Sequence, residues 1–179
     1  DIPMAAGMAV FTSNFKQAAM GFDHLHQGAF ITIFHNPIDI YLEQYTKQNE
    51  ASSYDNLLVR HLSGIDQENR KVNNGDYDVA RKVLRLKFVI GSCDNPSETL
   101  NRLVKLIGNS DSNIDSDRCT KERQRWNQQC RKMKELGQQN KSSQNNQQIL
   151  RNIKSDHYYD ILLYEESKKL FHEQKRLFE

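Results

Sequence analysis

The residues that could bind or transform a ligand gather where one short apolar run ends. Phe30 to Phe34 is nearly all apolar, and it stops at His35-Asn36-Pro37 before a helical pattern starts. A strand that ends in a polar turn and feeds a helix is the usual phosphate-binding geometry of α/β proteins, because the first N–H groups of the helix face the turn. This stretch is therefore the first candidate for an anion-binding site.

Two histidines upstream of this run are candidates for a catalytic base. His24 and His26 lie in GFDHLHQGAF, and their spacing puts both side chains on the same side of an extended segment. A histidine beside a hydroxyl group can remove its proton during a transfer reaction. The same pair could bind a metal ion, but the sequence shows no third ligand. Surface or loop histidines are the alternative interpretation.

The three cysteines, Cys93, Cys119 and Cys130, match no spacing of a metal site. Cys119 and Cys130 could close a short loop in a secretory compartment, which would leave Cys93 alone in an apolar strand. Three free thiols in a reducing compartment fit the sequence equally well. The cysteine pattern therefore leaves the compartment open.

The length and the charge of the chain restrict the classes of protein to which it can belong. A chain of 179 residues fits a single domain over 1–179 with a core of its own. The formal charge of +2, from 25 basic and 23 acidic side chains, is too small to indicate nucleic acid. The basic stretch from Lys121 to Lys134 is interrupted by Glu122 and reads as a solvated helix face. No run of 18 apolar residues exists, so we expect no membrane segment.

The elements that would position the candidate residues follow from local patterns. The run Ala29 to Phe34 predicts a buried strand, and Pro37 suits the first turn of a helix that continues to about Gln48. A second apolar strand is predicted from Phe88 to Ile90, ended by Gly91. Two strands that are each followed by a helix predict an α/β fold with a parallel sheet.

Other segments complete this organisation. Ser53, Asp55 or Asn56 is expected to cap a helix that stops at Gly64, and Asp76 is expected to cap the next one. Ser97 or Asn95 is expected to cap the helix after the second strand. A polar helix around Trp126 and a long C-terminal helix from His157 are also predicted, with a disordered low-complexity insertion over 138–148 between them.

The order of four stretches resembles the carbohydrate O-sulfotransferases, most of all the heparan sulfate 2-O-sulfotransferase-like group. That family has a strand–turn–helix with two arginines, a serine and a tyrosine, an Asp-Asn-x-x-x-Arg helix, a helix–strand–helix, and a C-terminal Asp-x-x-Leu-Tyr helix. The matching stretches here are ITIFHNPIDIYLEQY, DNLLVRHLSG, DYDVARKVLRLKFVIGSCDNPSETLNRL and DILLYEESKKLFHEQ.

The resemblance implies a P-loop-like sulfotransferase fold and a reaction. The family transfers a sulfuryl group from 3′-phosphoadenosine 5′-phosphosulfate to a hydroxyl of a glycan acceptor in the Golgi or secretory pathway lumen. Its N-terminal loop of Lys, Thr, Gly and Ser residues, which holds the 5′-phosphosulfate, has no counterpart here. The implied fold therefore lacks that loop unit, either because the chain is shortened at its start or because the protein lacks the site.

The family's functional positions carry over to named residues. His35 stands at the first arginine that binds the 3′-phosphate, Ile40 at the second, and Glu43 at the serine. A neutral histidine binds phosphate more weakly than the charged fork of arginine, and a carboxylate repels it. Arg60 is the matching basic residue of the second stretch, either for cofactor phosphate or for an ion pair with Asp55 or Asp39. His24 or His26 stands for the catalytic base.

Three functions stay open at this point. The first is sulfuryl transfer to a glycan, and the second is a non-catalytic sulfotransferase-like protein that binds glycans. The third is an α/β interaction scaffold unrelated to sulfation.

Overall fold

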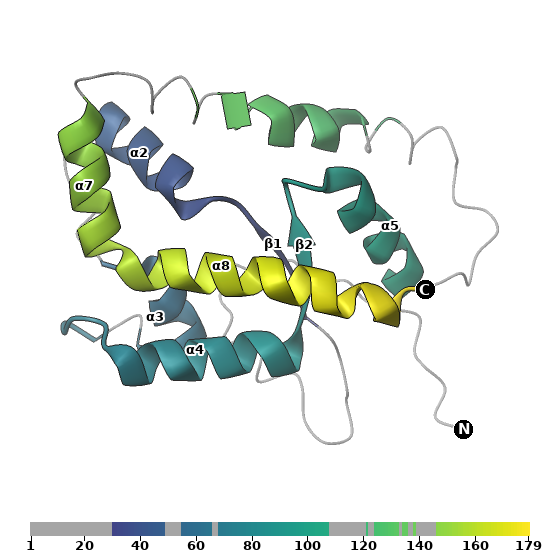
Figure 1. The fold of residues 1–179 in the computed structure, drawn as a ribbon, viewed down its shortest axis with the longest axis horizontal. Helices are drawn as coiled ribbons and strands as arrows, with labels where there is room; N and C mark the ends of the chain where they lie inside the picture. Colours follow the sequence, from purple (N-terminus) through teal and green to yellow (C-terminus); the bar gives the residue numbers. More distant parts are fainter. Residues whose placement is uncertain are drawn as a thin grey trace.

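The computed structural model of this chain describes residues 30–48, 55–65, 68–107, 121, 124–132, 134–135, 138 and 146–179. These residues form a mixed α/β structure that is mostly helical, with a small parallel sheet (Figure 1). A further helical stretch occupies 124–132. The elements are β1 (Phe30–Phe34), α2 (Pro37–Gln48), α3 (Leu57–Ser63), α4 (Asn74–Lys87), β2 (Phe88–Ser92), α5 (Pro96–Ile107), α7 (Gln147–Asp156), α8 (Tyr158–Glu173) and the 3₁₀ turn η2 (Gln174–Leu177).

The sheet confirms the predicted parallel pairing of the two apolar strands. β1 and β2 pair in register from Phe30↔Phe88 to Phe34↔Ser92, and the Cys93 N–H donates to the Phe34 carbonyl at 3.3 Å just beyond. Parallel strands need a long crossover, which α2, α3 and α4 occupy. The carboxyl ends of both strands consequently lie at one edge of the sheet.

Gly91 does not end β2, as the sequence suggested, but lies within it. A Cβ atom at this position would lie 2.5 Å from Thr99 Cγ2 and 3.0 Å from Ile33 Cγ1. The glycine is therefore needed for close packing of α5 against the sheet rather than for chain termination.

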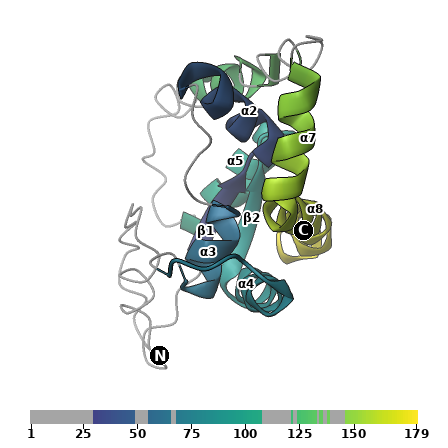
Figure 2. The ribbon, with the colours of Figure 1, turned by 90° about the vertical axis from the view of Figure 1, so that its left-hand side faces the viewer.

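The described helices form two groups, one of which packs against the sheet. α8 packs against β2, α4 and α3, while α7 lies beside α2 (Figures 1 and 2). The main core joins the strands to α3, α4 and α8 around Val59, Leu84, Ile90 and Leu163. A smaller cluster of Tyr41, Leu42 and Ile153 holds α2 to α7.

Two helix boundaries test the capping predictions. α3 ends at Gly64 as predicted: its φ of 81° is left-handed, and its N–H donates to the Arg60 carbonyl at 2.9 Å. The prediction that Asp76 caps α4 is wrong. Asn73 is the N-cap, and Asp76 at the third helical position bonds back to the Asn73 N–H at 2.9 Å, a capping box.

The predicted C-terminal helix is preceded by a second one. α7 ends at Asp156, α8 begins at Tyr158, and His157 between them has φ −115° and ψ 31°. Gln147 and Gln148, at the end of the stretch predicted to be disordered, form the first turn of α7. Most of that stretch lies outside the described residues.

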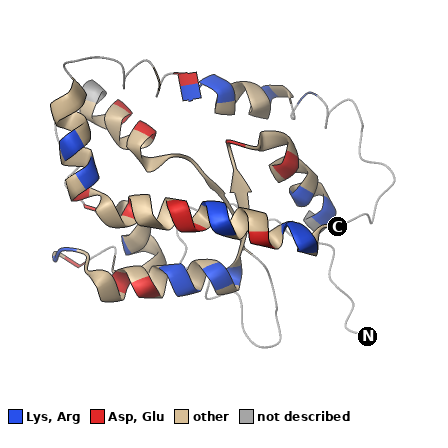
Figure 3. Ribbon diagram, viewed as in Figure 1, with Lys and Arg blue, Asp and Glu red and all other residues tan. Residues whose placement is uncertain are grey.

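The surface of these elements carries charges of both signs. Figure 3 shows Asp and Glu toward the N-terminal ends of α4 and α5 with Lys and Arg toward their C-terminal ends, whereas the two signs alternate along α8. Among the helices described, none is both long and apolar enough to cross a membrane.

Candidate functional site

The turn between β1 and α2 has the shape of a phosphate site, but its backbone donors are already engaged. Pro37 has no N–H, and the Ile38 N–H donates to Asn36 Oδ1 at 3.0 Å. The N–H groups of Asp39 and Ile40 donate to the Asn36 carbonyl at 3.0 and 3.4 Å. The first turn of α2 therefore bonds within the turn, and no N–H group of these positions is left to point at an anion.

His35, at the position of the family's first arginine, faces a sulfur atom. Its Nε2 lies 3.1 Å from Cys93 Sγ. Burial lowers the pKa of His35, although the nearby carboxylates of Asp94 and Asp39 act in the opposite direction. The ring is therefore mostly neutral at pH 7 and brings no positive charge to this turn.

The two other family positions on α2 lie along the helix. Ile40 is 42% exposed, and Glu43 is partly buried. Glu43 follows Pro37 by six residues, which places it about 9 Å further along the helix axis.

Arg60 is buried and directs all three guanidinium nitrogens to partners within its own neighbourhood. Its Nε donates to the Asp55 carbonyl at 2.8 Å and to Asp55 Oδ1 at 3.1 Å. Its Nη1 donates to the Glu68 carbonyl at 2.9 Å, and its Nη2 donates to Asp55 Oδ1 and to the Arg70 carbonyl. The ion pair with Asp55, one of the two interpretations from sequence, is thus present. Arg60 fastens the loop before α4 to α3.

Two of the stretches that carry the family resemblance meet in space. Asn56, in left-handed conformation with φ 47°, accepts the Asp160 N–H at 3.0 Å and donates from Nδ2 to the Asp156 carbonyl at 2.9 Å. Asparagine is among the few residues that adopt this conformation readily. The Asp-Asn helix and the C-terminal helix are therefore joined by side chains far apart in sequence.

Asn56 holds the N-cap position of α3, one of the positions expected from sequence, but its side chain makes no cap bond to the helix. The carboxylate of Asp160 in α8 caps the first turn instead. Its Oδ1 accepts the Val59 N–H at 2.8 Å, and its Oδ2 accepts the Leu58 N–H at 3.0 Å and the Tyr41 hydroxyl at 2.6 Å. Burial raises the pKa of Asp160, and these three donors oppose that shift. The prediction for Asp55 is wrong, because its carboxylate bonds Arg60 and the Val72 N–H instead. Ser53 lies outside the described residues.

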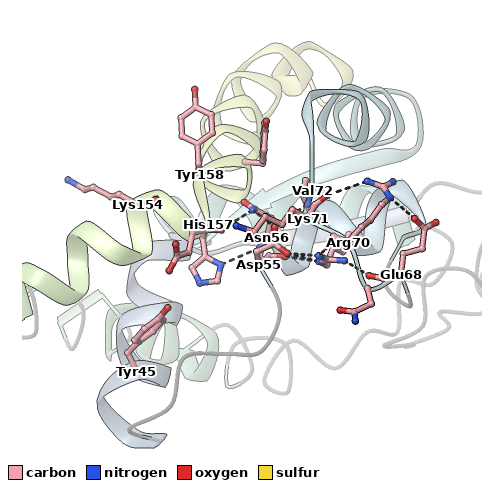
Figure 4. Close-up of a pocket in the computed structure, with 15 residues that line it drawn as sticks. Tyr45, Asp55, Asn56, Glu68, Arg70, Lys71, Val72, Lys154, His157 and Tyr158 are labelled. Atoms are coloured by element: carbon pink, nitrogen blue, oxygen red, sulfur yellow. Dashed lines mark hydrogen bonds and ion pairs between the residues drawn. The ribbon is translucent and has the colours of Figure 1, made fainter.

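A polar cleft of about 790 Å³ opens beside this network (Figure 4). Its walls come from Tyr45 of α2, the start of α3, the loop 68–72 and residues 154–159 at the α7–α8 junction. Arg60 and Arg70 in these walls are paired with Asp55 and Glu68. Lys71 and Lys154 are exposed cations on the same walls. The cleft thus combines internally paired charges with two exposed ammonium groups and the exposed carboxylate of Asp156.

His157 lines the cleft with one ring nitrogen unused. The side chain is 1% exposed, stacks on Tyr41 with ring centroids 3.5 Å apart, and accepts the Asn56 N–H at Nδ1 over 3.3 Å. Burial lowers the pKa of His157, while Asp156 and Asp55 oppose the shift. The neutral ring therefore carries its proton on Nε2, where no acceptor lies among the described residues. Leaving such a buried donor unpaired costs about 1–3 kcal/mol.

The cysteines pair in a way that the sequence did not indicate. Cys93 and Cys130 form a disulfide with Cα atoms 5.2 Å apart, so the alternative pairing of Cys119 with Cys130 is wrong. With His35 they form a group of three metal-ligating side chains whose atoms lie within 4.8 Å of one another. In the structure each of His35 and Cys93 directly follows its strand, so strand pairing brings them together. The predicted end of the second strand at Ile90 would have placed Gly91 beside His35 instead. No local spacing points to Cys130.

His24 and His26, the candidates for a catalytic base, lie outside the described residues. The described site residues fall into two regions: His35 with the cysteines at the carboxyl edge of the sheet, and Arg60 at the cleft around His157. Comparisons with models of protein families, with curated proteins and with solved structures found no match to this chain. The geometry of these two regions therefore carries the functional argument.

Proposed function

We propose that this chain is a non-catalytic sulfotransferase-like protein that binds an acidic glycan in the cleft around His157. The observation that carries the proposal is the unpaired Nε2–H of a neutral, buried histidine in the wall of a polar cleft. Because Nε2 is itself buried, the cleft wall would have to move slightly for a hydroxyl or sulfate oxygen of a bound glycan to accept this proton. Buried polar groups without a partner are rare in folded proteins, and each calls for an explanation such as a functional role or a bound water or ion.

The other walls of the cleft suit a sulfated or carboxylated sugar chain. Tyr158 is 51% exposed and offers a ring and a hydroxyl group, while the ring of Tyr159 meets it edge-on at 5.3 Å and donates its hydroxyl to Asn74 Oδ1 at 2.9 Å. Such rings pack against sugar faces while their hydroxyls hydrogen-bond. Lys71 and Lys154 supply positive charge for the acidic groups.

Sulfuryl transfer from 3′-phosphoadenosine 5′-phosphosulfate to a glycan acceptor is the second candidate. The parallel strands with a helix after each carboxyl end support a P-loop-like arrangement. Under this second function, His24 or His26 would be the catalytic base. His35, Glu43 and Arg60 would line the nucleotide, and the reaction would take place in the Golgi lumen. The neutral His35, the engaged amides of α2 and the engaged guanidinium of Arg60 favour the first candidate.

Calorimetric titration of the full chain with a sulfated heparan-type oligosaccharide tests the first candidate. We expect binding that weakens about tenfold in His157→Phe, which keeps an aromatic ring but loses the N–H; one hydrogen bond to a charged group is worth about 1.5–3 kcal/mol. His61→Phe, at an exposed position of α3, is the matched control and should bind normally. The desulfated oligosaccharide should bind more weakly than the sulfated one.

A second variant keeps this test decisive if His157→Phe fails to fold. Lys71→Ala with Lys154→Ala alters only exposed side chains of the cleft and should also weaken binding. Unchanged affinity in both variants, or no binding to the unaltered chain, would overturn the proposal.

Titration with 3′-phosphoadenosine 5′-phosphate separates the two candidates. The first predicts no micromolar binding, and predicts that His35→Arg with Glu43→Ser restores some, since arginine and serine bind phosphate where histidine and glutamate do not. Micromolar binding to the unaltered chain would contradict the non-catalytic assignment.

A further inference from the structure

The carboxyl edge of the sheet brings together three side chains that prefer soft metal ions. His35 directly follows β1 and Cys93 directly follows β2, and the two strands pair in register up to Phe34 and Ser92. Cys130 reaches the same point from the helical stretch 124–132. A second contact between these segments joins Lys134 Nζ to Asp94 Oδ1 at 3.8 Å. Three ligand-type residues from separate parts of the chain thus converge on one place.

The distances suit a single small ion. His35 Nε2 lies 3.1 Å from Cys93 Sγ, and all three ligand atoms lie within 4.8 Å of one another. Zn–S bonds of about 2.3 Å and Zn–N bonds of about 2.0–2.1 Å in tetrahedral geometry place ligand atoms about 3.5–3.8 Å apart. Cys130 is 3% exposed and the other two side chains are partly buried, so the site is sheltered yet reachable. Only a modest separation of the two sulfurs is needed.

We propose that His35, Cys93 and Cys130 bind Zn²⁺ when the disulfide between the two cysteines is reduced. Two thiolates and one imidazole form a donor set that selects zinc over calcium or magnesium, which take oxygen ligands. Three protein ligands leave the fourth tetrahedral position to water. The site is distinct from the cleft around His157 and does not depend on the glycan proposal.

Reduction converts the disulfide form of the site into the form that binds Zn²⁺. A small dithiol supplies two electrons and two protons, the S–S bond between Cys93 and Cys130 breaks, and the dithiol becomes a cyclic disulfide. Zn²⁺ then binds both sulfurs as thiolates and releases their two protons to solvent. Oxidation of the thiolates back to the disulfide removes two of the three ligands and expels the ion. Occupancy of the site therefore follows the redox state.

Metal binding to the full chain tests the proposal. We expect the chain reduced with a dithiol to bind one Zn²⁺ in competition with a chelating dye, and the oxidised chain to bind none. Co²⁺ in place of Zn²⁺ should give the thiolate charge-transfer band and the visible bands of a tetrahedral complex. His35→Gln should weaken binding at least about tenfold, because even the loss of an outer-shell partner costs that much.

The third cysteine provides the matched control. Cys119→Ser should leave Zn²⁺ binding unchanged, whereas Cys93→Ser or Cys130→Ser should abolish it. If those variants do not fold, alkylation of the unaltered reduced chain followed by mass spectrometry gives the same information, with Zn²⁺ protecting Cys93 and Cys130 but not Cys119. No binding by the reduced chain, equal binding by the oxidised chain, or protection that includes Cys119 instead of Cys93 or Cys130 would overturn the proposal.

Discussion

His35 Nε2 lies 3.1 Å from Cys93 Sγ, and each residue is the first to follow its strand. The parallel register that ends at Phe34↔Ser92 makes this proximity a direct consequence of strand pairing. Ligands of open α/β sheets bind at this same edge. The edge here presents a histidine and two cysteines, where the family resemblance would place an arginine for a phosphate.

Arg60→Lys should destabilise the chain strongly. A lysine keeps the positive charge but cannot replace the fork that bonds the Asp55 carboxylate and four backbone carbonyls. Each buried carbonyl left without its partner costs about 1–3 kcal/mol. We expect a loss of about 3 kcal/mol in the free energy of unfolding, measured with urea. Arg151→Lys, at an exposed position of α7, should change it by less than about 0.5 kcal/mol. A small effect at Arg60 would mean that its interactions with the loop are dispensable.

Asp160→Ala should cost more than Tyr41→Phe. The alanine leaves the Leu58 and Val59 N–H groups without their cap, and each unpaired buried donor costs about 1–3 kcal/mol. The phenylalanine removes one hydroxyl that donates to Asp160 and should cost about 1 kcal/mol. Thermal and urea unfolding measure both, with Asp78→Ala as an exposed control on α4. Equal effects of the two variants would argue against the capping role.

Stability should fall as the pH drops below about 6.5, the ordinary pKa of histidine. Burial lowers the pKa of His157 and of His35 in the folded chain, so between each folded pKa and 6.5 the unfolded chain binds more protons. The free energy of unfolding then rises with pH across that window, by up to about 1.4 kcal/mol per pH unit for each histidine.

Urea unfolding at a series of pH values from 7.5 to 5.5, above the range of ordinary carboxylates, measures this slope. His157→Phe should reduce it, because one of the two contributing rings is gone. His61→Phe, on the exposed face of α3, should leave it as it is. A slope that is unchanged in His157→Phe would show that His157 does not contribute to it.

Gly91→Ala should destabilise the chain by about 1–3 kcal/mol, the usual cost of overpacking. The new Cβ would lie 2.5 Å from Thr99 Cγ2. Thr99→Ser removes that methyl group but keeps the hydroxyl that bonds the Ser92 N–H and carbonyl. The double variant should therefore be more stable than the sum of the two single effects predicts, by urea unfolding. If the effects of the two single variants simply add, the contact with the Thr99 methyl group is not the cause of the destabilisation.

Elements with local signals were predictable from the sequence. The apolar runs at Phe30 and Phe88, Pro37 at a helix start and Gly64 at a helix end all act within a few residues. The cap of α4 was misplaced because Asn73 and Asp76 are both good capping residues, and the box uses both. Local chemistry alone could not decide which comes first.

The parts of the site that were missed depend on contacts between distant segments. His157 looks like an ordinary helix residue in sequence, yet its backbone breaks the helix and its ring bonds Asn56, 101 positions away. Asp160 caps a helix 102 positions earlier, and Cys130 pairs with Cys93 across 37 residues. Each of these pairings needs the fold before it becomes visible.

The cap that Asp160 provides also constrains when the chain can fold. α3 has seven residues, too few for a stable helix on its own, and its first N–H groups bond a side chain of α8. The N-terminal part of the chain leaves the ribosome first. We therefore expect α3 and the loop before α4 that Arg60 bonds to stay unfolded until residue 160 has left the exit tunnel. Folding of this region is therefore expected to be completed only after Asp160 has emerged from the ribosome. A product that stops before Asp160 would lack the group that starts α3.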